Sequence, residues 1–300
     1  MPALNNAVPS PRQQGLLAAM PWVFVAVWST GFVVARLAMP HAPPLSFLTW
    51  RYAFSLLAFG LWIHLARVAW PKGRAQWGHL AVSGVLMHGG YLGGVWAAVR
   101  AGIPAGTVAL IVGLQPLLTA LWVSGRGQHR VAPLQWGGLL LGLAGLALVV
   151  WPKFGLGEVT PVNLGLSVLA LASITAGTLY QKRHVQPTDV RTANFVQLGA
   201  ALLVSLPLAL LEPGGMQWQP ELVVALAWSV LGLSLGGSSL LFMLIQRGAA
   251  TRVTSLFYLV PPCTAVLAWF LFDEQMAGLA WGGMALCALG VGLVRRADAA

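Results

Sequence analysis

Polar side chains that could do chemistry are rare within the long apolar runs of this sequence. His88 lies near the middle of one run, and Tyr91, three residues later, falls on the same face of a helix. His88 is the best titratable candidate, because histidine changes charge near neutral pH. The alternative is a buried neutral imidazole that is hydrogen-bonded to a neighbour. Together the two side chains can line a cavity.

One cation also falls inside an apolar run. Arg51 lies roughly 9 Å from the end of its run, given the rise of an α-helix. A charge at this depth is costly unless it snorkels to the surface, pairs with an anion or lines water. Two readings therefore stay open for Arg51, which are snorkelling and the binding of a substrate carboxylate.

Hydroxyl groups cluster at two further places. Trp28, Ser29 and Thr30 fall in the middle of the first run, and Ser173 and Thr175 occupy the corresponding part of the sixth. The two clusters either face each other across a cavity or make the hydrogen bonds between helices that serine and threonine commonly provide in membranes. Weaker candidates of the same kind are Ser234, Ser238, Ser239 and Tyr258.

Prolines interrupt the fourth and ninth runs at matching positions. Pro116 lies in the fourth run, and Pro261 and Pro262 lie in the ninth. A proline inside a helix removes a hydrogen bond and bends the helix. We expect these three residues to act as hinges.

The composition sets the fold class. Hydrophobic residues make up 58% of the 300 residues and charged residues 8%, whereas soluble domains carry about 25% charged residues. Runs of about 20 apolar residues match the thickness of a bilayer. The sequence therefore predicts an all-α, polytopic transmembrane protein with ten spans, at about 16–35, 45–66, 77–99, 102–124, 133–151, 162–181, 192–211, 221–244, 248–272 and 276–294.

The charges predict an orientation. The net charge is +10, but the basic residues lie between the runs, which argues against a nucleic-acid partner. With a cytoplasmic N-terminus, thirteen of the seventeen basic residues face the cytoplasm, as the positive-inside rule requires. Both termini are then cytoplasmic. Cys263 and Cys287 fall inside apolar runs, so we expect no disulfide and no metal site, and nothing indicates a cofactor.

An internal repeat divides the chain. Trp136-Gly137-Gly138, followed by Gly145, matches Trp281-Gly282-Gly283, followed by Gly290. Each half has five spans, so equivalent helices run in opposite directions, as in transporters that expose a central site to each side in turn. We expect a tail at 1–15, a first repeat at 16–151, an inverted second repeat at 162–294 and a tail at 295–300.

The chain resembles the EamA-type family of the drug/metabolite transporter superfamily. The resemblance rests on Trp28-Ser29-Thr30-Gly31-Phe32-Val33, Pro44 to Arg51-Tyr52, Gln115-Pro116-Leu117, Leu179-Tyr180-Gln181-Lys182-Arg183, Pro261-Pro262 and Phe272-Asp273-Glu274 ahead of Trp281-Gly282-Gly283. It implies two five-helix halves around a central cavity, alternating access, and export of amino acids or related metabolites from a bacterial inner membrane.

These observations favour a secondary carrier that is not an enzyme. We expect a cavity lined by the first, third, sixth and eighth spans, a small-molecule substrate, and a monomer or homodimer in the lipid bilayer. All seven acidic residues lie in loops or tails, which weakens an acid-based proton relay and favours facilitated diffusion or exchange. Two rivals stay open: a drug or lipid exporter of similar fold, and a membrane enzyme acting on lipid-linked substrates.

Overall fold

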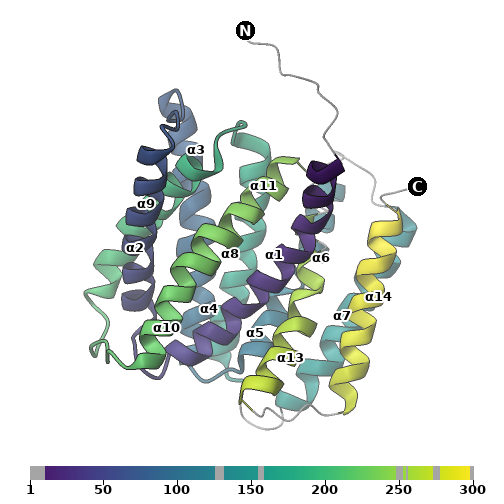
Figure 1. Cartoon of the computed structure of the whole chain (residues 1–300). Helices are drawn as coiled ribbons and strands as arrows, with labels where there is room; N and C mark the ends of the chain where they lie inside the picture. Colours follow the sequence, from purple (N-terminus) through teal and green to yellow (C-terminus); the bar gives the residue numbers. More distant parts are fainter. Residues whose placement is uncertain are drawn as a thin grey trace.

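The computed structural model describes residues 11–125, 132–154, 159–247, 253–254, 256–272 and 278–297. The expected tail residues 1–10 and the Asp273-Glu274 pair lie outside these ranges. All regular elements in the described residues are helical (Figure 1). They are α1 (Pro11–Ala38), α2 (Pro44–Leu65), α3 (Arg74–Gly84), η1 (Val85–Gly90), α4 (Tyr91–Arg100), α5 (Ala105–Val112), α6 (Gln115–Gly125), α7 (Pro133–Phe154), α8 (Pro161–His184), α9 (Val190–Ala209), α10 (Pro220–Trp228), η2 (Ser229–Ser238), α11 (Ser239–Arg247), η3 (Leu256–Tyr258), α13 (Val260–Phe272) and α14 (Gly278–Ala297).

These elements join into long rods that match the predicted spans. One rod is formed by α3, η1 and α4, and another by α10, η2 and α11. Among the residues that the structure describes, six rods are by themselves long and apolar enough to cross a membrane: Ala19–Ala38, Arg74–Arg100, Ala105–Gly125, Pro161–His184, Val190–Ala209 and Pro220–Arg247. The helix α2, with 22 residues, is also long enough to cross a membrane.

Local sequence sets where several of these helices begin. Proline is the first residue of α2, α7, α8 and α10, where its fixed φ suits a helix and its missing N–H costs nothing. Thr160 and Asn163 form a capping box at the start of α8. At the start of α2, the Glu212 carboxylate accepts hydrogen bonds from the N–H groups of Leu45 (2.9 Å) and Ser46 (2.8 Å). These two hydrogen bonds connect the start of α2 to the segment after α9.

The helices are arranged as two inverted halves. The helix α1 begins, and α14 ends, at the same end of the bundle (Figure 1). We call this the terminal end and the opposite one the far end. Equivalent helices such as α1 and α8 run in opposite directions (Figure 1), which confirms the expected inverted arrangement.

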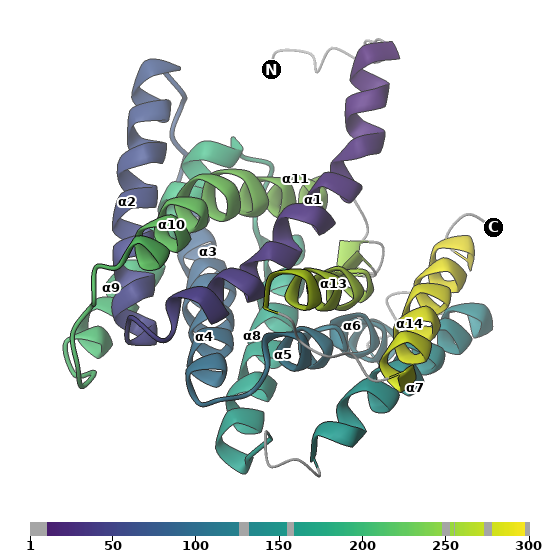
Figure 2. The same ribbon diagram turned by 60° about the horizontal axis from the view of Figure 1, so that its bottom comes forward.

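The last helices of the two halves pack on each other through the repeated glycines. The helices α7 and α14 lie side by side at one edge of the molecule in both views (Figure 2). A Cβ atom at Gly145 would overlap the Gly283 carbonyl, and one at Gly290 would overlap the Gly138 carbonyl. Small residues let helix backbones approach closely. The contact is therefore reciprocal between repeat-equivalent positions.

The third and fourth rods of each half depart from regular α-helix. The segments η1 and η2 are π-helical and lie in repeat-equivalent rods. The fourth rods break at Gly113-Leu114, just before Pro116, and at Leu259, just before Pro261 and Pro262. A Cβ atom at Gly113 would lie 3.0 Å from Cγ of Pro261. The two breaks therefore touch each other at the centre of the bundle.

Candidate functional site

A small cavity lies in the half of the bundle nearer the far end. Its lining residues come from α1, α2, α4 and η2, and they are Trp28, Gly31, Phe32, Arg51, Tyr91, Leu92, Val95, Trp96 and Leu233. The volume of about 20 Å³ is room for about one water molecule. Ligand pockets for small molecules measure about 300 Å³ or more. The space is therefore too small for such a solute, which can bind there only if the surrounding side chains or helices move.

Arg51 is the charged residue of the cavity wall. Its side chain is 3% exposed, so it does not snorkel to the surface. Its Nε donates a hydrogen bond to the Ser234 Oγ of η2 at 3.1 Å. Arg51 forms no salt bridge with any of the described residues, where the ion pair present joins Arg191 to Asp189. The guanidinium therefore faces the cavity without a protein anion.

Aromatic rings form the rest of the wall. The Trp28 and Tyr91 rings lie parallel, with centroids 6.1 Å apart and an interplanar angle of 4°. Trp28 also meets the Phe257 ring edge-on at 5.8 Å. On the far side, Phe47 stacks behind Trp96 at 4.4 Å. A cation beside apolar rings suits a solute with one anionic and one apolar end.

Of the pair His88 and Tyr91, only Tyr91 lines the cavity. His88 is buried, and its backbone carbonyl accepts a hydrogen bond from the Tyr52 hydroxyl at 2.7 Å. Its Nδ1 has no hydrogen-bond partner among the described residues. The two residues do not share a face because His88 lies in the π-helical segment η1, where each residue turns through a smaller angle than in an α-helix.

The hydroxyls of the first cluster serve helix packing. Ser29 Oγ donates to the Val25 carbonyl (2.6 Å), and the Ser29 carbonyl accepts from Thr264 Oγ1 of α13 (3.1 Å). Thr30 Oγ1 donates to the Val27 carbonyl (2.6 Å) and accepts from Trp228 Nε1 of α10 (2.8 Å). Neither hydroxyl is part of the cavity wall.

The second cluster and Ser238 behave in the same way. Thr175 Oγ1 donates to the Leu171 carbonyl at 2.7 Å, and Ser238 Oγ donates to the Leu233 carbonyl at 3.2 Å. Ser173 packs against Gly90, where a Cβ atom would lie 2.5 Å from its Oγ. The cavity wall contains no residue of α8, contrary to our expectation for the sixth span, and α2 takes that place through Arg51.

Tyr258 lies away from the cavity. It packs with Ala120 and Leu139, and a Cβ atom at Gly142 of α7 would lie 2.9 Å from its ring. The cavity residues that the sequence did not single out are apolar ones, such as Leu92, Val95 and Leu233. They carry no chemical signal that distinguishes them from residues facing lipid.

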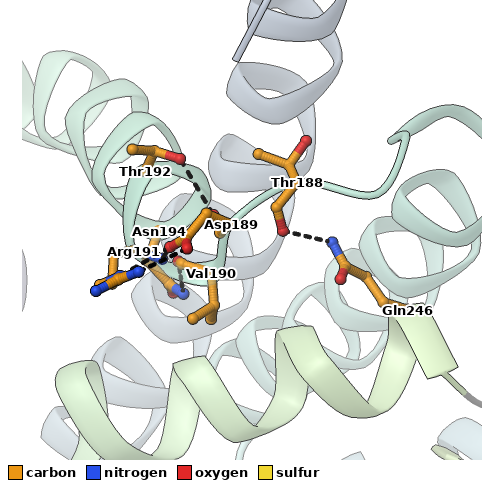
Figure 3. Close-up of polar contacts among 7 residues, drawn as sticks. All are labelled: Thr188, Asp189, Val190, Arg191, Thr192, Asn194 and Gln246. Carbon is orange, nitrogen blue, oxygen red and sulfur yellow. Dashed lines mark hydrogen bonds and ion pairs between the residues drawn. The ribbon is translucent and has the colours of Figure 1, made fainter. Parts of the chain in front are cut away.

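The terminal end is closed by the segment between α8 and α9. Gln246 Nε2 of α11 donates to the Thr188 carbonyl at 3.1 Å (Figure 3). On the other side, Gln76 Nε2 of α3 donates to Thr188 Oγ1 (2.8 Å) and to the Gln186 carbonyl (3.0 Å). This one segment therefore links the third rods of both halves.

An ion pair sits where this segment enters α9. Arg191 donates from Nη2 to Asp189 Oδ2 (2.7 Å) and from Nε to Asp189 Oδ1 (2.9 Å) (Figure 3). The hydrogen bonds from the Arg191 side chain hold the pKa of the Asp189 carboxyl below its usual value. Asp189 Oδ1 also accepts from the Arg191 N–H and so caps α9.

Both halves of the chain match one family of known proteins. The profile of the EamA-like transporter family matches residues 15–151 and again residues 163–296. The chain belongs to the EamA-like transporter family. It is a multi-pass membrane transporter, and the resemblance drawn from the sequence is confirmed.

Several curated proteins are similar to this EamA-family chain over most of its length. A "Probable amino-acid metabolite efflux pump" of Escherichia coli K12 is 24% identical over 290 residues, which cover 93% of this chain and 94% of the relative. "Protein PecM" of Dickeya dadantii is 30% identical over 258 residues, covering 83% and 82%. A solved crystal structure superposes with a TM-score of 0.70 at 20% identity, covering 92% of this chain and 95% of the other. That structure shares the fold.

Proposed function

We propose that this transporter exports amino acids, or small amphipathic metabolites that carry a carboxylate, by alternating access. The proposal is carried by the buried Arg51 guanidinium, which faces an aromatic cavity and forms no ion pair with any residue that the structure describes. Removing a charge from water is costly, and a substrate carboxylate that accepts two parallel hydrogen bonds from the guanidinium N–H groups offsets that cost. The name of the Escherichia coli relative supports the same substrate class.

In this proposal, the residues that line the cavity bind different parts of the substrate. Arg51 binds the carboxylate, while Trp28 and Tyr91 contact an apolar side chain. Three of the remaining predicted residues support the helices rather than the solute: Ser29 and Thr30 join α1 to α13 and α10, and Ser173 packs against Gly90 of η1. Pro116, Pro261 and Pro262 stand at the helix breaks and are proposed as the hinges of the rocking motion.

The proposed orientation places the terminal end in the cytoplasm of a bacterial cell. Basic residues gather at that end, including Arg67, Lys72, Arg74, Lys182 and Arg183. Export then begins when the contacts of Thr188 with Gln76 and Gln246 break and the terminal end opens. Among the described spans, the acidic residue is Glu221, in the first turn of α10 and away from the cavity wall, so exchange or facilitated diffusion is the proposed energetics.

The test is counterflow in proteoliposomes. Vesicles loaded with unlabelled phenylalanine or leucine should accumulate the labelled form, and Arg51→Lys should reduce this uptake about tenfold or more, because a lysine cannot reproduce a two-pronged contact. Arg74→Lys, at an exposed position of α3, is the matched control and should keep full uptake. Lack of counterflow with every amino acid contradicts the proposal.

A drug exporter of the same fold is the second candidate, favoured by the apolar rings around the cavity. The buried positive charge of Arg51 disfavours lipophilic cations, which would meet it at close range without screening. Counterflow of a neutral or cationic lipophilic dye that Arg51→Lys leaves unchanged would favour this alternative.

A further inference from the structure

Two consecutive residues of α2 form hydrogen bonds to the π-helical segments η1 and η2. Arg51 Nε donates to Ser234 Oγ in η2 at 3.1 Å, and the Tyr52 hydroxyl donates to the His88 carbonyl in η1 at 2.7 Å. The segments η1 and η2 belong to equivalent rods of opposite halves. If α2 moves relative to η1 or η2, the hydrogen bond to that segment must break, or the segment must move together with α2.

The segment η2 is unusual in its length. It runs over 10 residues, whereas π-helix normally occurs as a single turn inside an α-helix and often at functional sites. Three of its residues, Gly232, Gly236 and Gly237, are glycines that stabilise a helix poorly. Intrinsic preference does not explain this long π-helical stretch, so contacts with its neighbours must hold it.

The segment η2 packs against residues of α1 that line the cavity. Leu233 supplies the part of the cavity wall that comes from η2, and a Cβ atom at Gly31 would lie 3.5 Å from its Cδ2. A Cβ atom at Gly237 would lie 3.3 Å from the Trp28 ring. Displacement of η2 therefore withdraws Leu233 from the cavity and enlarges the space between Arg51 and Trp28.

The bond that holds η2 is one that a carboxylate can replace. The Ser234 hydroxyl is a neutral acceptor that takes a single hydrogen bond from the Arg51 guanidinium, whereas a carboxylate brings the opposite charge and can accept two parallel hydrogen bonds from the same fork, Nε included. An amide or alcohol offers Arg51 no more than Ser234 already does. Only an anionic solute gains enough to displace the hydroxyl.

We infer that Ser234 is a specificity-determining residue of this transporter. While the cavity is empty, the Ser234 hydroxyl accepts the hydrogen bond of Arg51 Nε. A solute carboxylate replaces the hydroxyl as the acceptor. This releases η2 and moves Leu233 out of the cavity. Solutes without a carboxylate leave η2 in place and are transported slowly even when their side chain fits. The inference rests on the proposed function, since it assigns the trigger of the same site.

Transport kinetics test the inference with a matched pair of variants. Ser234→Ala removes the competing hydroxyl, whereas Ser229→Ala removes a buried hydroxyl of the same segment that has no hydrogen-bond partner in the described part of the chain. With Ser234→Ala, we expect the KM for phenylalanine counterflow to fall about tenfold, and its preference over phenylalaninamide to shrink by a similar factor. Ser229→Ala should match the wild type. An unchanged KM and preference in Ser234→Ala would overturn the inference.

Hydrogen–deuterium exchange gives a second readout that needs no transport. In wild-type protein without solute, the amides of 229–238 should exchange slowly, and Ser234→Ala should speed their exchange while leaving α9 unchanged. Phenylalanine should have the same effect on wild type. Failure of counterflow with faster exchange in Ser234→Ala would contradict the proposed function alone, whereas equal exchange in Ser234→Ala and Ser229→Ala would overturn the role of Ser234.

Discussion

The Arg51 guanidinium of the first half rests on the Ser234 hydroxyl of the second half, with 3.1 Å between Nε and Oγ. A buried cation is thus held by a neutral group at the junction of α2 and η2. Burying such a charge costs stability, so its presence in the core indicates a functional role. Residues of this kind mark substrate pathways in membrane proteins.

Replacement of Arg51 should therefore raise stability and abolish function together. Arg51→Met keeps an unbranched apolar stem and removes the buried charge, so we expect the unfolding temperature in detergent to rise by about 2–4 °C. Counterflow of carboxylate solutes should be lost. A lower unfolding temperature would contradict the view that the charge lacks a protein anion, and retained counterflow would contradict its role in binding.

Trp28 should contribute to the choice of side chain. Its ring stacks on Tyr91 over the cavity, so Trp28→Leu removes the aromatic surface but keeps an apolar residue. We expect the KM for phenylalanine to rise about tenfold, since an aromatic pair contributes about 0.5–1.5 kcal/mol beyond the burial of area. The KM for alanine, measured in the same vesicles, should change much less. Equal effects on both substrates would place Trp28 outside the binding surface.

Gly84 should be required for closure of the terminal half. A Cβ atom there would overlap the Gln197 backbone of α9. Gly84→Ala therefore forces α3 away from α9, and we expect a loss of about 2 kcal/mol or more in stability, measured by thermal unfolding. Gly78→Ala is the control in the same helix, because a Cβ there meets nothing within 4 Å. Its expected effect is neutral or stabilising, and equal losses in both variants would contradict the close packing.

The Asp189–Arg191 pair should make the terminal end sensitive to acid. Because Arg191 lowers the pKa of Asp189 in the folded protein, the pair stabilises the fold above the ordinary pKa of an aspartate. That contribution is lost as the pH falls through the lowered value. The local opening of 185–191, measured by hydrogen exchange corrected for the intrinsic exchange rate at each pH, should therefore rise on going from pH 6 to below pH 4.

Asp189→Asn is the control for this pH dependence. Asparagine also caps helices well, so the start of α9 is kept while the titrating charge is removed. The variant should show faster exchange at pH 6 and a smaller additional change in acid, after correction for intrinsic exchange rates. The same acid response in the wild type and in Asp189→Asn would exclude this pair as its source.

The fold could be predicted largely from the sequence because lipid allows few solutions. Apolar runs of membrane length require helices, and the Trp-Gly-Gly repeat predicts that α7 and α14 are equivalent. The reciprocal contacts of Gly145 with Gly283 and of Gly290 with Gly138 explain why those glycines repeat. The π-helical segments could not be predicted, since π- and α-helices are built from the same apolar residues.

The charged residue of the candidate site, Arg51, could be predicted from the sequence, whereas most of the other residues that line the cavity could not. Arg51 stood out because a lone cation in an apolar run demands a partner. The hydroxyls of Ser29, Thr30 and Thr175 gave the same polar signal, but each bonds a carbonyl of its own helix. Serine and threonine do this readily, so their type alone does not separate a packing role from a binding role.

Equilibrium binding to the purified transporter tests the central claim most directly. Phenylalanine and phenylalaninamide differ at the carboxylate, so their affinities should be compared by calorimetry for the wild type and for Arg51→Met. The account predicts that wild type binds phenylalanine at least about tenfold more tightly than the amide and that Arg51→Met loses this difference. Equal affinities for the two ligands in the wild type, or an unchanged difference in Arg51→Met, would contradict a carboxylate site at Arg51.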